Sequence, residues 1–213
     1  MFKPCIGPNV DCTACPGLVR SRVIYDYKKP TWGYGSKISQ LIFIGEAPGR
    51  NGCGRTGIPF NGDPSGDYYQ ECLAAAGLTL DDVYTTNAVK CCPPANRTPT
   101  LVERVECSQR WLEKELAEVE GKIIVPLGRT ALESFITFPT SMSSIVGTAF
   151  KFEKYIVVPY YHPAYALRLG KPAWYKEGLK RIISCQAIRT ARLPEEIALE
   201  SQREASSGQK ETQ

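Results

Sequence analysis

Residues 40–49 read QLIFIGEAPG, where a short apolar run ends abruptly at a glycine and an acidic residue. A continuous run of branched and aromatic residues of this length predicts a strand that is buried on both faces. Three later runs have the same character, namely DVYTTNAV (82–89), KIIVPLG (122–128) and YIVVPYY (155–161). We expect these four segments to be the strands of one sheet.

Helix-compatible segments lie between and after these strands, at 65–76, 98–119, 129–138 and 172–192. Strands that alternate with helices predict a parallel sheet with helices on both faces. The expected fold class is therefore α/β, a three-layer α/β/α sandwich with a central four-stranded parallel sheet. We expect one domain over 1–193, with an irregular cysteine-containing lead-in over the first 37 residues, and a polar, flexible tail at 194–213.

The composition limits the class of protein without choosing the function. The 26 basic and 22 acidic residues give a net charge of +4, which neither requires nor excludes an anionic partner. Nine cysteines and the absence of a signal-like N-terminus argue against a secreted disulfide scaffold. The apolar runs are far shorter than the ~20 residues that span a bilayer. We expect a cytoplasmic protein with no membrane role.

A polar residue lies at or directly after the end of each predicted strand. These residues are Glu46, Asn87, Arg129 in GRT (128–130), and His162, which is the only histidine of the chain. In open parallel sheets, ligands bind at the carboxyl ends of the strands, so the four are expected to meet at one edge. Each one alone would more often be a helix cap or an ordinary loop residue, but four together favour a site.

The cysteines suggest a metal centre. CTAC (12–15) is a C-x2-C pair, and Cys91 and Cys107 form a second, looser pair. Four such thiolates suit either zinc or an iron–sulfur cluster, and the loose second pair favours the cluster. The alternative is that they are unpaired and act as small apolar residues, a description that fits Cys5, Cys53, Cys72 and Cys185 better.

Taken together, six segments resemble the uracil-DNA glycosylase superfamily, in particular its iron–sulfur family 4. They are CTACPGLVRSR, GEAPG, RTGIPFNGD, NAVKCCPPANRTPT, IVPLGRTALESF and YYHPAYALR. The loop RNGCGRTGIPFNGDPSGD (50–67) is more similar to family 5 in its length and in lacking an acidic run after GEAPG. The resemblance implies a [4Fe–4S] cluster on Cys12, Cys15, Cys91 and Cys107, and excision of uracil from DNA.

The resemblance also implies roles for the residues of a uracil pocket. Phe60 would stack on the base, Asn87 would read its N3–H and O4, and Gly45 and Ala47 would bring the backbone close to it. His162 would donate a hydrogen bond to O2 of the departing base. Glu46 would position the attacking water or stabilise the sugar cation.

Further residues are expected to contact DNA. Leu167 is the predicted wedge into the base stack, with Tyr165 as the alternative, and Arg168 and Arg129 would bind phosphates. Other basic residues flank the expected site, namely Arg20, Arg22, Lys90, Arg97, Lys171, Lys176, Lys180 and Arg181.

The expected activity is that of a monofunctional uracil-DNA glycosylase that leaves an abasic site in single- or double-stranded DNA. Because residues 50–54 have no bulky side chain, slow action on 5-substituted uracils or on hypoxanthine is expected as a minor activity. A metal-stabilised nucleic-acid-binding module without catalysis is the alternative. We expect a monomer, with a sliding-clamp contact as a further partner to test.

Overall fold

The computed structural model describes residues 12–26, 30–134, 136–137 and 140–184. The predicted tail at 194–213, the end of the last predicted helix, Cys5 and Cys185 lie outside this part of the chain.

A six-stranded sheet forms the centre of the described structure, in the order β1-β3-β2-β4-β6-β5. The inner strands β3, β2, β4 and β6 are parallel, as predicted, so the α/β fold class is confirmed. The outer pairs β1–β3 and β5–β6 are antiparallel, and these two edge strands were not predicted. Each is only two residues long, too short to produce a periodic pattern. The strands are β1 (Tyr34–Gly35), β2 (Leu41–Gly45), β3 (Tyr84–Asn87), β4 (Ile123–Pro126), β5 (Phe150–Lys151) and β6 (Ile156–Val157).

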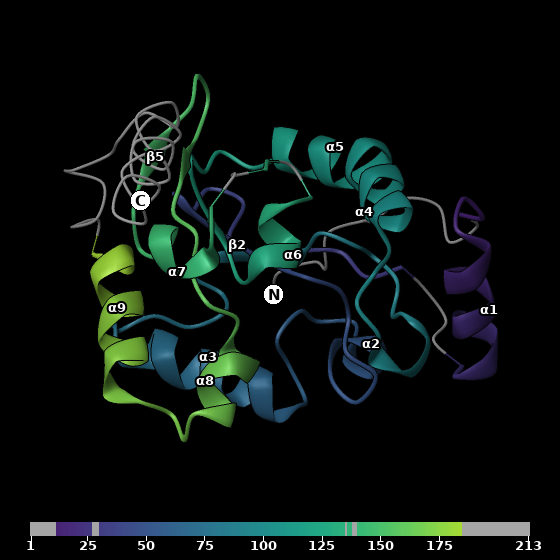
Figure 1. Cartoon of the computed structure of the whole chain (residues 1–213), viewed down its shortest axis with the longest axis horizontal. Coiled ribbons are helices and arrows are strands. Elements are labelled where there is room, and N and C mark those ends of the chain that lie inside the picture. Colours follow the sequence, from purple (N-terminus) through teal and green to yellow (C-terminus); the bar gives the residue numbers. More distant parts are fainter. Residues whose placement is uncertain (1–11, 27–29, 135, 138–139, 185–213) are drawn as a thin grey trace, which may run out of the picture.

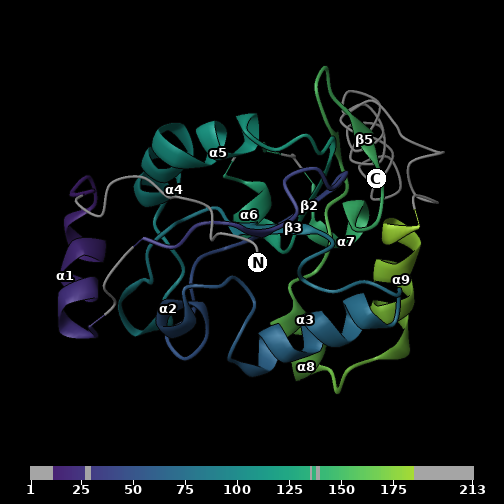
Figure 2. The same cartoon turned by 180° about the vertical axis from the view of Figure 1, so that it is seen from behind.

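Helices cover both faces of this sheet (Figures 1 and 2). Successive side chains of a strand point to opposite faces. Phe43 accordingly joins the cluster that includes Tyr69 and Leu179, and Ile42 joins the cluster that includes Leu112 and Leu132. The first cluster holds α3 (Pro64–Ala74), α8 (Pro163–Arg168) and α9 (Ala173–Ile183), and the second holds α5 (Glu113–Ala117), α6 (Arg129–Leu132) and α7 (Met142–Ile145).

The N-terminal lead-in is less irregular than predicted, because residues 16–24 form helix α1 (Pro16–Ile24). Only Leu18 and Ser21 of this helix are buried. Leu18 packs with Val89 and Cys107 in a small core of its own, at one end of the molecule (Figure 1). Because only two residues of α1 are buried, its sequence has almost no periodic apolar pattern. Packing against the rest of the protein therefore determines that this segment is helical.

The predicted helix 98–119 begins later than expected and is divided in three. Thr100 caps α4 (Leu101–Cys107), and its hydroxyl and Glu103 form a capping box. A π-helical turn, Ser108–Leu112, then leads into α5. Pro99 directly precedes the capping residue Thr100 and lies outside the helix. The two remaining short elements are α2 (Cys53–Thr56) and the 3₁₀ turn Pro94–Asn96.

Among the described helices, none is long and apolar enough to cross a membrane.

Candidate functional site

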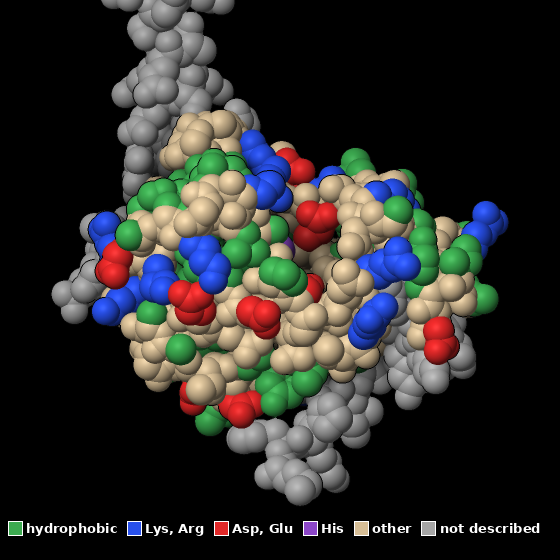
Figure 3. All heavy atoms as spheres, turned by 90° about the horizontal axis from the view of Figure 1, so that it is seen from below, with side chains coloured by type: hydrophobic (Ala, Val, Ile, Leu, Met, Phe, Trp, Pro, Cys, Tyr) green, Lys and Arg blue, Asp and Glu red, His purple; other side chains and the backbone are tan. Residues whose placement is uncertain are grey.

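A pocket opens at the carboxyl ends of β2 and β3, where the sequence predicted a site. The structure brings Glu46, Ala47, Phe60, Asn87 and His162 together in its lining. Figure 3 shows the histidine side chain inside a hollow, with an acidic side chain beside the hollow and Lys and Arg side chains further out on the same face. The other lining residues are Pro48, Gly49, Cys53, Asp63, Ser65, Pro93, Asn96, Arg97, Thr98, Ala164 and Arg168.

Asn87 is the last residue of β3 and is 4% exposed. It pairs in register with Gly45, the last residue of β2. The ladder continues beyond both strands, because the Val89 N–H donates to the Glu46 carbonyl at 3.0 Å. The amide of Asn87 therefore projects from a rigid part of the sheet.

Gly45 does not line the pocket, but its lack of a side chain shapes it. A Cβ at this position would lie 2.4 Å from Asn87 Oδ1 and 2.8 Å from Phe60 Cε2. Both contacts are closer than real Cβ atoms make. Glycine is thus required here so that the amide and the ring can pack directly against the backbone of β2.

Phe60 forms an aromatic wall of the pocket. Its ring centroid is 4.7 Å from that of Tyr69 and 5.4 Å from that of His162. Its φ of 51° lies in the left-handed region, an unfavourable backbone conformation that the surrounding structure must impose. Such strain is concentrated at functional positions in folded proteins, and here it directs a bulky ring toward the pocket.

His162 caps helix α8, and this role determines its tautomer. The Ala164 N–H donates to His162 Nδ1 at 3.1 Å, so Nδ1 is an acceptor without a proton. Burial, helped by the charge of Arg168, lowers the pKa of His162 to about 4. The imidazole is therefore neutral at ordinary pH, with its proton on Nε2.

Glu46 lies directly after β2 and is half-buried. Burial raises the pKa of its carboxyl group, and hydrogen bonds from Thr130 and Thr98 and the charge of Arg104 oppose that rise. Thr130 belongs to α6 and Thr98 to the segment before α4. The carboxylate is consequently held between two elements that are distant in sequence.

Cys53 is a pocket residue whose contact with the site the sequence did not reveal. The prediction that it is a buried apolar residue is confirmed, since it is 3% exposed. It also touches the site, because Asn87 Nδ2 donates to Cys53 Sγ at 3.8 Å. Burial raises the pKa of this thiol to about 12, so it remains neutral. Its position in the loop 50–67 was the only available signal.

The residues predicted to contact DNA divide by position. Arg168 lines the pocket, and Tyr165 is exposed. Leu167 packs in part against the core, whereas Leu169 is 51% exposed. The wedge assignment stays a prediction. Arg129 donates to the Thr140 carbonyl and lies near Glu133, so its guanidinium is already engaged within the protein.

Among the flanking basic residues, the prediction for Lys90 is wrong, because its side chain is completely buried and pairs with Glu115. Lys171 and Lys176 both pair with Glu71, and Arg97 makes two bonds of 2.7 Å to Glu103. Such partners compete with phosphates for these cations. Arg20, Lys180 and Arg181 are exposed.

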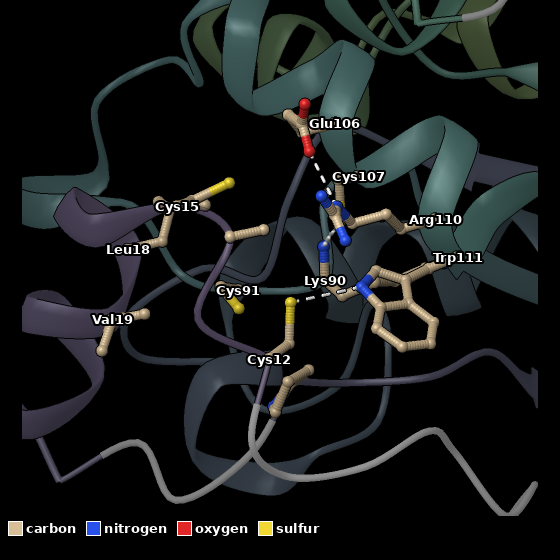
Figure 4. Close-up of a pocket in the computed structure, with 12 residues that line it drawn as sticks. Cys12, Cys15, Leu18, Val19, Lys90, Cys91, Glu106, Cys107, Arg110 and Trp111 are labelled. Atoms are coloured by element: carbon tan, nitrogen blue, oxygen red, sulfur yellow. Dashed lines mark hydrogen bonds and ion pairs between the residues drawn. The ribbon is translucent and has the colours of Figure 1, made fainter.

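The four cysteines of the predicted metal centre line a second cavity, between α1 and α4. Cys12 and Cys15 lie in the segment directly before α1, where Cys15 is the N-cap residue. Cys91 follows β3, and Cys107 ends α4 (Figure 4). The sequence separates these pairs by more than 70 residues, and the fold brings them together. Leu18, Val19, Pro30 and Trp111 provide apolar walls.

Two N–H groups point at these sulfurs. Trp111 Nε1 donates to Cys12 Sγ at 3.4 Å, and the Lys90 backbone N–H donates to Cys107 Sγ at 3.2 Å. Burial raises the pKa of Cys91 to about 12 and that of Cys107 to about 11. Thiolates in this cavity therefore require a positively charged partner. Within the described ranges, no three Cys, His, Asp or Glu side chains are arranged to bind a single metal ion.

Comparison with known proteins gives a consistent result. A family model described as the uracil DNA glycosylase superfamily matches residues 32–182. The chain is 36% identical over 162 residues to the type-4 uracil-DNA glycosylase of Thermotoga maritima, covering 74% of this chain and 78% of that protein. It is 38% identical over 143 residues to the type-4 uracil-DNA glycosylase of Archaeoglobus fulgidus, with coverages of 63% and 70%. It is also 38% identical over 149 residues to the type-5 uracil-DNA glycosylase of Thermus thermophilus, with coverages of 59% and 67%.

Proposed function

This chain belongs to the uracil DNA glycosylase superfamily and is a hydrolytic uracil-DNA glycosylase of DNA repair, and we propose that its pocket beside β2 and β3 holds the flipped-out uracil. The observation that carries this proposal is the convergence of Glu46, Phe60, Asn87 and His162 on one pocket. A base inside a duplex is out of reach of these groups, so the nucleotide must leave the stack before it can bind.

The direct test is base excision from defined DNA. We expect the protein to release uracil from single- and double-stranded oligonucleotides, which alkali then cleaves at the abasic site. An identical strand with cytosine in place of uracil is the control. DNA that is bound but stays intact over varied salt and pH would support the nucleic-acid-binding module instead.

Recognition follows from two pocket residues. The Phe60 ring offers a face on which the pyrimidine stacks, an interaction worth about 1–3 kcal/mol. The Asn87 amide can accept from uracil N3–H and donate to O4, whereas cytosine presents the reverse pattern. A cytosine in the pocket would leave buried polar groups unpaired, and that cost excludes it.

The other two pocket residues, His162 and Glu46, account for cleavage. Breaking the N-glycosidic bond leaves negative charge on the base and positive charge on the sugar. The Nε2–H of neutral His162 can donate to uracil O2 as that charge develops, and its rigid cap geometry supplies the donor already in place. The Glu46 carboxylate serves the cationic side, where it orients water or stabilises the sugar.

The pH dependence should report Glu46 rather than His162. Because burial raises the pKa of Glu46 while that of His162 falls to about 4, the carboxylate is lost first as pH decreases. We expect single-turnover cleavage to fall below neutral pH as Glu46 protonates. Glu46→Gln should be slow at every pH and lack this acid limb. A Glu46→Gln variant that retained the limb would assign it to another group.

We propose that Cys12, Cys15, Cys91 and Cys107 bind a [4Fe–4S] cluster. In a [4Fe–4S] cluster each of the four irons takes one thiolate, so four cysteines complete the set. The convergence of these cysteines on one cavity and the N–H groups aimed at two of the sulfurs support the cluster. The cluster would supply the positive charge that keeps these thiolates ionised and would clamp α1 to the segment 91–107.

Purified protein should be brown, with broad absorbance near about 400 nm and iron and sulfide bound in equal amounts. Cys91→Ser should lose most of this absorbance, and Cys72→Ser, at a buried cysteine of another cluster of the core, should keep it. Colourless protein with stoichiometric zinc would contradict the proposal.

We also propose a minor activity on 5-substituted uracils or hypoxanthine. Cys53 is the only residue of the segment 50–54 in the pocket lining, and its side chain is small. A pocket can discriminate between two bases that differ by one methyl-sized group by only about 10–200-fold. Excision of 5-hydroxymethyluracil and thymine should therefore be measurable, well below that of uracil. Rates at the uncatalysed background for all such bases would contradict this.

A further inference from the structure

Among the residues that the structure describes, Lys90 is the largest charged side chain that is completely buried, and the reaction described above does not use it. It lies three residues after Asn87 and directly before Cys91. Its side chain is 0% exposed, and that of its partner Glu115 is 4% exposed.

Every proton of the Lys90 ammonium has an acceptor. One goes to Thr86 Oγ1 at 2.8 Å, one to the main-chain carbonyl of Asn87 at 2.6 Å, and one to Glu115 Oε2. Lysine has three donors, so this set is complete.

Glu115 is equally well satisfied. Its carboxylate accepts from the Gly33 N–H at 2.6 Å, the Tyr84 hydroxyl at 2.9 Å and the Thr86 hydroxyl at 3.0 Å. The network thus ties α5 to β3 and to the residue preceding β1.

The bond to Asn87 is the informative one. Strand β1 pairs only with Tyr84 and Thr85, so its ladder stops before Asn87 on that side of β3. Beyond this ladder, the Lys90 ammonium donates to the main-chain carbonyl of Asn87. The side chain of Asn87 lines the pocket. The Lys90 main chain is itself held, since its carbonyl accepts from Thr31 N at 2.7 Å and its N–H donates to Cys107 Sγ.

A buried ion pair is a weak source of stability, because a well-packed apolar pair of the same size often does as well. Stability alone therefore does not account for this network. We propose that Lys90 is a positioning residue, which holds the end of β3 so that the Asn87 amide stays aimed at the base. This rests on the proposed role of Asn87. Selectivity for uracil over cytosine then depends on a side chain that never touches DNA.

The test replaces both charges together, so that no unpaired charge is buried. In Lys90→Met/Glu115→Gln, we expect the ratio of single-turnover rates on uracil and cytosine to fall by about 10-fold or more. DNA affinity, iron content and the unfolding midpoint should stay close to those of the parent. The matched control is Lys37→Met/Glu118→Gln, which removes an exposed pair of the same residue types with N–O distance 2.8 Å. It should leave the ratio unchanged.

Thr86→Val provides a second variant should the double variant fail to fold. It removes one hydroxyl from the network and keeps both charges, so it should lower the ratio by a few-fold. A folded double variant with the parental ratio would overturn the inference, as would an unfolded double variant together with a parental ratio in Thr86→Val. Parent protein that leaves uracil-containing DNA intact would instead contradict the proposed function.

Discussion

Replacing His162 with alanine is expected to slow single-turnover excision of uracil by about 10²–10³-fold, the usual effect of removing one donor to a developing anion. The structure explains why the effect should fall on catalysis. The ring is neutral, its Nδ1 is occupied by the Ala164 N–H, and only Nε2 has a proton to donate toward the pocket. Alanine also removes the imidazole ring whose centroid lies 5.4 Å from that of Phe60, so the variant loses one wall contact of the pocket as well as the donor.

The cleavage rate is measured in quenched single-turnover reactions, with enzyme in excess over a uracil-containing strand. DNA affinity is measured by a gel-shift titration. Affinity should change by less than about threefold, because the lost interaction forms mainly in the transition state. His162→Asn offers a shorter side chain with an N–H donor and should recover part of the rate. Cleavage by His162→Ala at the parental rate would make the only histidine structural, and backbone donors would then stabilise the leaving base.

Replacing Asn87 with aspartate is expected to produce the largest change in specificity. The parent should favour uracil over cytosine by about 10⁴-fold or more, and the variant should lose at least about 100-fold of that preference. A protonated carboxyl can donate to cytosine N3 and accept from its amino group, the pattern that the amide opposes. At a site where Asn87 is 4% exposed, burial should raise the pKa of the new carboxyl.

This gives the change a pH signature. Cytosine excision by Asn87→Asp should increase as pH falls and the carboxyl protonates, until loss of the Glu46 carboxylate limits cleavage of either base. This pH dependence is measured from excision rates on two oligonucleotides that differ only in carrying uracil or cytosine. Asn87→Ala is the control, because it removes the reading of both bases and should slow both. An aspartate variant as selective as the parent would show that another group reads the base.

Much of this molecule was predictable from local patterns. The runs near 41–45, 123–126 and 156–157 became parallel strands because a strand buried on both faces is rich in apolar, branched residues. The fourth strand, 84–87, reads YTTN, and its two β-branched threonines are buried because their hydroxyls bond to Tyr69 and Glu115. The order of the four strands along the chain with helices between them placed Glu46, Asn87 and His162 at one edge. The motif resemblance predicted that Phe60 lies in the pocket and that the four cysteines form a metal centre. The fold places Phe60 in the pocket lining and brings the four cysteines to one cavity.

Other features depend on contacts between distant residues, which no local pattern records. The two-residue edge strands and α1 exist because neighbours pack or pair with them. Lys90 reads in sequence as one more surface cation near DNA, yet Glu115, 25 residues later, buries it.

What the sequence determined by itself was therefore the four parallel strands, the edge at which their polar residues meet and the residue types of the site. Only the tertiary structure decided their chemical state: a neutral His162 with its proton on Nε2, a half-buried Glu46 between two threonines, and an Asn87 held by Cys53 and Lys90. The physical reason is that strand and helix patterns arise from neighbours in the chain, whereas burial, protonation and hydrogen-bond partners arise from residues that meet only when the chain folds.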